Sequence, residues 1–150
     1  MGSRTKIEWC DATWNPVTGC LHGCEYCYAR RMAQRFTYGT YGIGDPDNDD
    51  LVFLTEPETK EIIDKNGKKK SIPVPYPFGF EPTFHHYRLD IPQRWPKHKV
   101  IFVCSMADLF GEWVPDRWIE EVFEACRKAP QHTYLFLTKN PDRLCDLANY

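Results

Sequence analysis

The sequence predicts an α/β fold in which strands and helices alternate and the strands form a parallel sheet. Two continuous apolar runs, "KVIFVCSM" and "HTYLFLTKN", are typical of strands that are buried on both faces. A helix pattern that opens at a proline, Pro115 or Pro141, follows each run. One strand–helix pair precedes them, and three such units are too few to close a barrel.

The first unit begins with a short strand in "KIEWCDATWNPVTGC", where β-branched and aromatic residues alternate with polar ones. Pro16 and Gly19 end this strand in a turn. The later segment "YARRMAQRF" contains good helix formers, and its spacing puts four apolar residues on one face: Ala29, Met32, Ala33 and Phe36. A loop rich in cysteine therefore lies between a strand and a helix.

Residues 37–88 are predicted to be an insertion, because turn signals, prolines and polar residues are concentrated there. Within it, "EIIDKNGKKKSIPV" predicts a β-hairpin, since Asn66-Gly67 suits a type I′ turn. Lys68, Lys69 and Lys70 have two interpretations: protection of an exposed strand edge, which we favour, or binding of phosphate. The segment "PVPYPFGFEP" is too rich in proline for a central strand.

The second helix is predicted to begin at Asp116, with an apolar stripe formed by Trp118, Ile119, Val122, Phe123 and Cys126. A further strand and the helix at Pro141 complete the order strand, helix, insertion, strand, helix, strand, helix. The chain stops inside this last helix pattern. We therefore expect a single domain over residues 1–150 that is the N-terminal part of a longer protein.

Polar and small residues follow each predicted strand. These residues are Gly19 and Cys20, then Ser105 to Asp108, then Thr138 to Asn140. In parallel sheets of βα units, functional residues lie at the carboxyl ends of the strands. We therefore expect the three groups to meet at one site.

Composition limits the classes of function. The 150 residues carry a net charge of −2 and have a pI near 6.2, so no global positive field attracts nucleic acid or a membrane. The sequence has neither a long apolar run nor a signal-peptide pattern, and we expect a soluble, cytoplasmic protein. Seven cysteines, an odd count, indicate metal or redox chemistry rather than a disulfide framework. Cys126 and Cys145 are expected to be small core residues.

Three of the cysteines, Cys20, Cys24 and Cys27, fall within eight positions. A structural zinc site would need a fourth ligand, for which the candidates are His22, Cys10, Cys104, His85 and His86. An iron–sulfur cubane held by three thiolates instead leaves one iron open, and catalysis requires an open iron. Gly19 and Gly23 would let the loop fold tightly around such a cluster.

The cysteine loop, "CLHGCEYC", resembles the C-x3-C-x2-C motif of the radical S-adenosylmethionine (radical SAM) superfamily, including its aromatic residue before the last cysteine. More narrowly, "DATWNPVTGC", "CYARRMAQRF", "IFVCSMADLFGEWVP" and "FLTKNPDRL" are similar to a phage- and prophage-associated family of radical SAM-like proteins whose substrate is not established. The resemblance covers most of the chain outside the insertion. It implies a partial (β/α) barrel of the radical SAM type.

The resemblance also implies the cofactors. A [4Fe–4S] cluster would be held by Cys20, Cys24 and Cys27, and SAM would chelate the fourth iron through its amino and carboxylate groups. An electron from the cluster would cleave SAM to methionine and a 5′-deoxyadenosyl radical, which abstracts hydrogen from a substrate. Tyr26 would pack beside the adenine, as the matching aromatic does in the superfamily.

The remaining SAM contacts are assigned from the strand ends. The superfamily often holds the SAM amino group with a Gly-Gly-Glu-like segment, for which this chain has "CSMADLFGE". Ser105 and Asp108 are the predicted substitutes, with the alternative that Asp108 only caps the following turn. Thr138 and Lys139 would face the SAM carboxylate or a substrate anion, and a solvated loop lysine is the alternative for Lys139.

Two other classes of function stay open: a non-catalytic iron–sulfur protein for electron transfer or sensing, and a zinc-stabilised module that binds nucleic acid. A radical SAM enzyme would need an electron donor such as flavodoxin or ferredoxin. Its substrate is unknown, nucleic acid is one candidate, and no membrane partner is expected. The later strands that complete the SAM contacts in the superfamily have no counterpart here, so this piece alone can be inactive.

Overall fold

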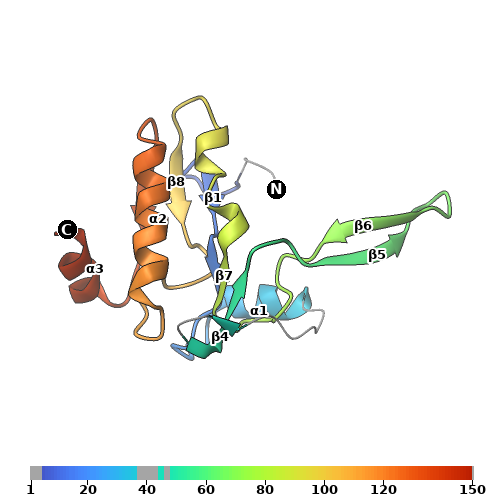
Figure 1. The fold of residues 1–150 in the computed structure, drawn as a ribbon, viewed down its shortest axis with the longest axis horizontal. Coiled ribbons are helices and arrows are strands. Elements are labelled where there is room, and N and C mark those ends of the chain that lie inside the picture. Colours follow the sequence, from blue (N-terminus) through green and yellow to red (C-terminus); the bar gives the residue numbers. More distant parts are fainter. Residues whose placement is uncertain (1–4, 37–43, 46–47, 150) are drawn as a thin grey trace.

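A computed structural model describes residues 5–36, 44–45 and 48–149 of the chain. Its main sheet has three parallel strands in the order β1 (Ala12–Trp14), β8 (Val100–Val103) and β9 (Thr133–Phe136) (Figure 1). The helices α1 (Tyr28–Arg35), α2 (Asp116–Lys128) and α3 (Pro141–Ala148) follow these strands along the chain. The predicted order of strands and helices and the parallel pairing are confirmed.

One face of this sheet packs against α2. The register places Ala12 and Trp14 beside Ile101 and Val103, so these four side chains share a face. All four are at most 1 % exposed. The predicted stripe on α2 is confirmed in the same core, with Trp118, Ile119 and Val122 fully buried and Phe123 and Cys126 packed against them.

The outer strand of the sheet is less buried than its apolar sequence predicts. In the described chain β9 pairs only with β8, so one of its edges has no strand partner. Three of its four residues are half-buried and Thr133 is exposed. The prediction of burial on both faces is correct for β8, where three of four residues are buried, and wrong for β9.

A second sheet joins the predicted insertion to the body of the protein. Its order is β2 (Val17–Thr18), β7 (Thr83–His85), β4 (Asn48–Leu54) and β3 (Gly44–Asp45). All of β7 is buried, and Phe84 stacks on Trp118 with ring centroids 5.1 Å apart. Two short 3₁₀ helices, η1 (His86–Arg88) and η2 (Pro92–Arg94), lead from β7 to β8. The last part of the insertion is therefore core.

The predicted hairpin is present, but its turn differs from the prediction. β5 (Thr59–Ile63) and β6 (Lys69–Pro73) form a separate two-stranded sheet that projects from the body (Figure 1). A type I′ turn needs positive φ at two residues, yet Gly67 has a φ of 75° and Asn66 is not positive. Asp64 and Lys68 instead bond through their backbones around a three-residue loop. We call residues 59–73 the arm.

Two further expectations concern the helices. No helix in the described part of the chain has the length and apolar character needed to cross a membrane. Cys126 is partly buried against the core, as predicted. Cys145 is exposed on α3, so the prediction that it is a core residue is wrong.

Candidate functional site

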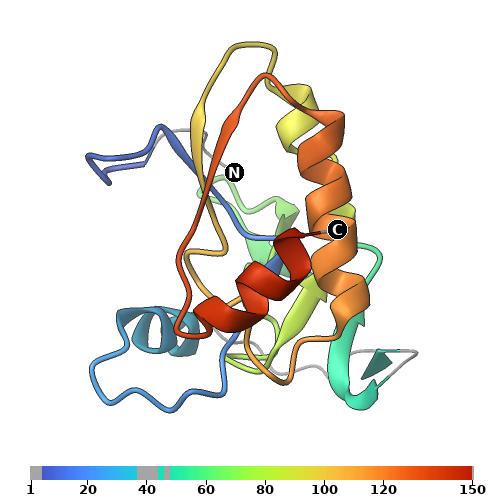
Figure 2. The same cartoon turned by 90° about the vertical axis from the view of Figure 1, so that its left-hand side faces the viewer.

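An open cavity of about 440 Å³ lies at the carboxyl ends of the three parallel strands. Figure 2 shows the loop before α1 and the start of α3 at this same end of the sheet. The cavity is lined by all eight residues that were predicted to hold the cluster or SAM: Cys20, Cys24, Tyr26, Cys27, Ser105, Asp108, Thr138 and Lys139. The three polar groups that follow the strands therefore meet at one place.

The cysteine loop is fixed where it begins. The backbone N–H of Gly19 donates to Met106 at 3.0 Å, and that of Cys20 donates to Phe80 at 3.2 Å. Gly19 has a φ of 89°, and a Cβ there would overlap the backbone carbonyls of Phe80 and Glu81. Only glycine fits this position, because a side chain would be strained in the left-handed region and would also strike main chain.

Asp108 connects the three strand ends. It is 6 % exposed, and its two carboxylate oxygens accept four hydrogen bonds. The donors are the His22 ring at 2.9 Å, the Thr138 hydroxyl at 2.6 Å, and the backbone N–H groups of Lys139 at 2.9 Å and Phe110 at 3.1 Å. Burial by itself would raise the pKa of Asp108, but these hydrogen bonds outweigh it and lower the pKa. The carboxylate stays ionised and ties the cysteine loop to the ends of β8 and β9.

Lys139 reaches across the cavity to the cysteine loop. Its ammonium donates to Cys24 Sγ at 2.7 Å and to the Tyr26 hydroxyl at 3.2 Å. It also lies 5.2 Å from the centre of the Tyr26 ring, a cation–π distance. The hydrogen bond from Lys139 lowers the pKa of Cys24, and the same bond raises the pKa of Lys139. A positive neighbour of this kind favours the thiolate, which is the form that binds metals.

The three thiols do not surround a single point. Cys20, Cys24 and Cys27 are free and half-buried. Burial raises the pKa of Cys20, and the negative charges of Asp108 and Cys27 add to this effect. Among the described residues there is no group of three or more His, Cys, Asp or Glu side chains that could hold one metal ion. The thiols are instead distributed around the wall of the cavity.

The candidates for a fourth protein ligand lie in different places. Of the five, His22 alone lines the cavity, and its ring is engaged by Asp108. Cys10 and Cys104 are buried, and burial raises the pKa of Cys104 to about 12. His85 is in the core against Thr18, and His86 lies 2.9 Å from the Glu121 carboxylate. Neither histidine of "FHHY" is therefore placed to complete a metal site with the cysteine loop.

Sequence reasoning missed four residues that shape the cavity. Asn15 accepts hydrogen bonds from the Ser105 hydroxyl and the Met106 N–H, both at 3.1 Å, through its side-chain oxygen. Tyr28 donates to the Ser105 carbonyl at 3.2 Å, and Leu137 and Phe80 line the wall. Asn15 was identifiable in principle, since it follows β1 directly at a strand end. The position of Phe80 could not be predicted, because Phe80 belongs to the insertion and does not follow one of the parallel strands.

The chain matches the model of a known protein family. Residues 4–150 match the model of a family described as "Protein of unknown function (DUF5131)". No significant match was found among curated proteins or among solved structures.

Proposed function

The chain belongs to the DUF5131 family, and we propose that it is a radical SAM iron–sulfur enzyme whose catalytic centre is the cavity at the strand ends. One observation carries this proposal. Three free thiols in a C-x3-C-x2-C loop line a single open cavity, together with polar residues from the other two strand ends. When bound, a [4Fe–4S] cluster would supply the electron that cleaves SAM and so starts radical chemistry on a substrate.

The donor set fits a cluster with an open corner. Cys20, Cys24 and Cys27 supply three thiolates, the normal ligands of such clusters. The other four cysteines of the chain do not line the cavity. The volume, about 440 Å³, lies within the usual range for ligand pockets.

Lys139 and Tyr26 have the chemistry to receive SAM. The Lys139 ammonium stands at the cavity and complements a carboxylate, and its approach to Cys24 favours the ligating thiolate. The Tyr26 ring is 78 % exposed at the cavity, so one of its faces is available for stacking on a planar base. These contacts support the roles that the resemblance implies for both residues.

Three of the predicted SAM contacts are better suited to positioning the loops of the cavity than to binding SAM. They are Asp108, Thr138 and Ser105. Both oxygens of Asp108 already accept hydrogen bonds from the protein, one of them from the Thr138 hydroxyl. The Ser105 hydroxyl donates to Asn15. We therefore propose that these three side chains hold the loops in place. The cavity then keeps its shape even when no ligand is bound.

A SAM-cleavage assay tests this proposal. Anaerobically reconstituted protein is treated with SAM and a strong reductant, and 5′-deoxyadenosine is measured by chromatography. We expect it to form in the wild type and to be lost, together with bound iron, in Cys24→Ala. Cys145→Ala is the matched control, because it removes an exposed thiol away from the cavity.

The two alternatives give different results in the same experiment. An electron-transfer or sensor protein would bind iron and sulfide without releasing 5′-deoxyadenosine, and a zinc module would bind neither. The ligand assignment would be wrong if Cys24→Ala kept the full iron content of the wild type. Iron and sulfide content is measured as well as cleavage, so that cluster binding and SAM cleavage are scored separately.

A further inference from the structure

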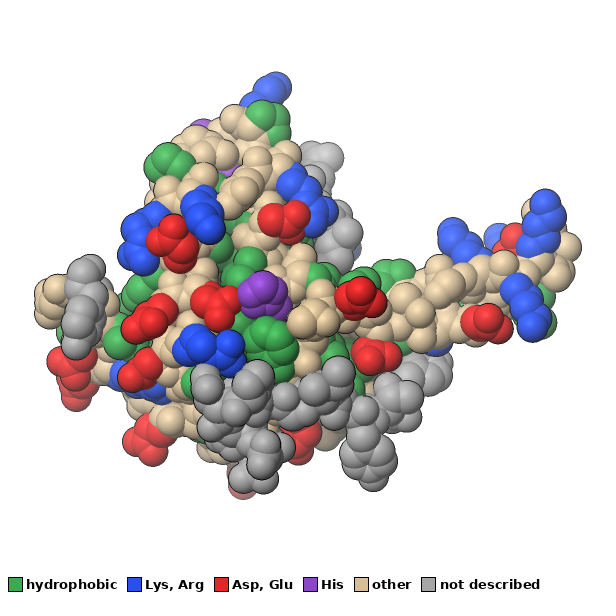
Figure 3. Space-filling model, viewed as in Figure 1, with side chains coloured by type: hydrophobic (Ala, Val, Ile, Leu, Met, Phe, Trp, Pro, Cys, Tyr) green, Lys and Arg blue, Asp and Glu red, His purple; other side chains and the backbone are tan. Residues whose placement is uncertain are grey.

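The arm is a positively charged ribbon that stands away from the rest of the protein. It carries five lysines and two acidic residues, whereas the whole chain has a net charge of −2. Figure 3 shows Lys and Arg side chains gathered toward its outer end. We propose that the arm binds duplex DNA, with the two-stranded ribbon in the major groove and its lysines on the phosphates.

The charge of the arm is local. Its net charge is +3, so the remainder of the chain is negative and repels a polyanion. On the arm, Lys69 and Glu61 form an ion pair at 3.8 Å, with both side chains at least 75 % exposed. Such a pair in water neutralises little of the charge.

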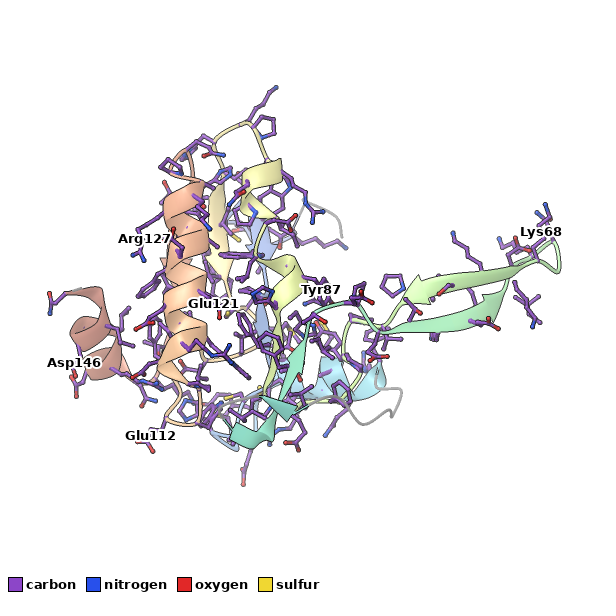
Figure 4. All side chains as sticks on the ribbon, viewed as in Figure 1. Lys68, Tyr87, Glu112, Glu121, Arg127 and Asp146 are labelled. Carbon is purple, nitrogen blue, oxygen red and sulfur yellow. The ribbon has the colours of Figure 1, made fainter. Side chains whose placement is uncertain are left out.

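Protection of strand edges does not account for all the lysines of the arm. Edge lysines discourage pairing with other strands, and that explanation suits Lys69 and Lys70 on β6. Lys65 and Lys68 lie outside both strands, in the turn, where there is no edge to protect. Figure 4 shows Lys68 at the far end of the arm. Positive charge at the tip suits contact with a partner instead.

The turn is built to hold the ribbon in one shape. The Asp64 side chain accepts hydrogen bonds from the backbone N–H groups of Asn66 at 2.8 Å and Lys68 at 2.9 Å. Gly67 takes the left-handed conformation that the loop requires. An isolated two-stranded ribbon is marginal in water, so this local bracing keeps the arm extended where the core cannot. A rigid element loses less entropy when it binds.

The position of the lysines along the ribbon favours a groove over a flat partner. The register places Lys60 and Lys70 on one face of the ribbon and Lys69 on the other, beside Glu61. The excess charge therefore lies along one face and at the tip, where Lys65 and Lys68 follow and precede the strands. The major groove of B-DNA admits a two-stranded ribbon and has phosphates along both walls. Duplex DNA therefore matches both the width and the charge of the arm.

The arm is also connected to the cavity. Residues 74–82 lead from β6 back to the body, and Phe80 in this segment lines the cavity and accepts the Cys20 N–H. DNA held on the arm would thus be bound next to the segment that forms a wall of the site. The proposal itself depends only on the arm, and it stands whether or not the cavity performs radical chemistry.

A binding titration tests the proposal. The full chain is titrated into a fluorescein-labelled, mixed-sequence DNA duplex, and anisotropy is followed at about 50 to 200 mM salt. The test variant is Lys65→Gln/Lys68→Gln/Lys70→Gln. The matched control, Lys6→Gln/Lys97→Gln/Lys128→Gln, makes the same change in net charge at exposed positions away from the arm.

We expect the arm variant to bind at least about tenfold more weakly, and its slope of log K against log salt to be shallower by about 3. The control should bind like the wild type. Equal affinity in the arm variant, or an equal loss in the control, would overturn the proposal. Tighter arm-dependent binding to single strands, duplex RNA or anionic vesicles would overturn the choice of partner. The SAM-cleavage assay is a separate readout, so failure of one proposal is distinguishable from failure of the other.

Discussion

The cavity and the arm are held in place in different ways. The cavity is fixed by buried contacts between segments far apart in sequence, such as the bond from His22 to Asp108, 86 residues away. The arm is held by local contacts: its two strands pair with each other, and Asp64 braces the turn between them. The cavity, whose chemistry depends on exact geometry, is thus built on the parallel sheet. The arm, whose proposed role is to present positive charge, needs only a two-stranded ribbon. The same type of substitution should therefore have different effects in the two regions.

The largest expected difference is between two glycines. Gly19→Ala should lower the free energy of unfolding by about 3 kcal/mol, because its left-handed φ is combined with a clash against main chain. Gly67→Ala in the arm has a similar φ but open space around it, so its cost should be about 1 kcal/mol. Urea unfolding of both variants measures the difference. Equal losses would contradict the claim that the start of the cysteine loop is sterically fixed.

A smaller difference is expected between two aspartates. Asp108→Asn should lower the free energy of unfolding by about 2 kcal/mol, since an amide cannot accept all four hydrogen bonds that the buried carboxylate accepts. Asp64→Asn keeps an oxygen that can accept the two N–H groups of the turn, and it should have little effect on unfolding. Iron content after reconstitution is the second measurement. An Asp108→Asn protein with wild-type stability and iron content would show that this carboxylate does not position the cysteine loop.

The dependence of stability on pH tests the burial of His85 in the body of the protein, a feature that has no counterpart in the arm. Burial lowers the pKa of His85 well below its usual value, so the folded state resists its protonation. The unfolded chain binds this proton near pH 6.5, and stability should therefore fall as the pH drops below that value, by up to about 1.4 kcal/mol per pH unit. His85→Gln should reduce the slope of unfolding free energy against pH. An unaltered slope in this variant would refute the assignment.

The smallest effect on stability is expected in the arm. Lys65→Gln/Lys68→Gln/Lys70→Gln should leave the thermal unfolding midpoint within about 2 °C of the wild type, because the three side chains are exposed and contribute nothing to the core. Calorimetry measures the midpoint. A large decrease would show that the lysines stabilise the fold, and the loss of DNA binding could then not be assigned to contact alone.

The sequence predicted the parts of the fold that depend on local pattern. The apolar runs and the prolines that open the helices located β8, α2, β9 and α3, and the rule for parallel sheets brought the three strand ends together. The same rule predicted that Cys20, Ser105 and Lys139 would face one cavity. Local pattern was sufficient here because each residue follows its own strand directly.

Contacts between distant segments were not predictable in this way. His85 is buried because it bonds to Thr18, 67 residues away, and nothing in "FHHY" indicates that partner. Asp108 accepts hydrogen bonds from the cysteine loop and from the end of β9, which the sequence presents only as separate motifs. The prediction of a type I′ turn in the hairpin was wrong for a different reason. The Asp64 side chain stabilises a longer loop than Asn66-Gly67 alone predicts.

Mössbauer spectroscopy of protein reconstituted with iron-57 tests the central claim most directly, since it reports each iron of a cluster separately. If Cys20, Cys24 and Cys27 hold a cubane with a vacant corner, added SAM should change the signal of a single iron and leave the other three as they were. A spectrum that SAM does not alter, from a cluster with thiolate on every iron, would contradict the account.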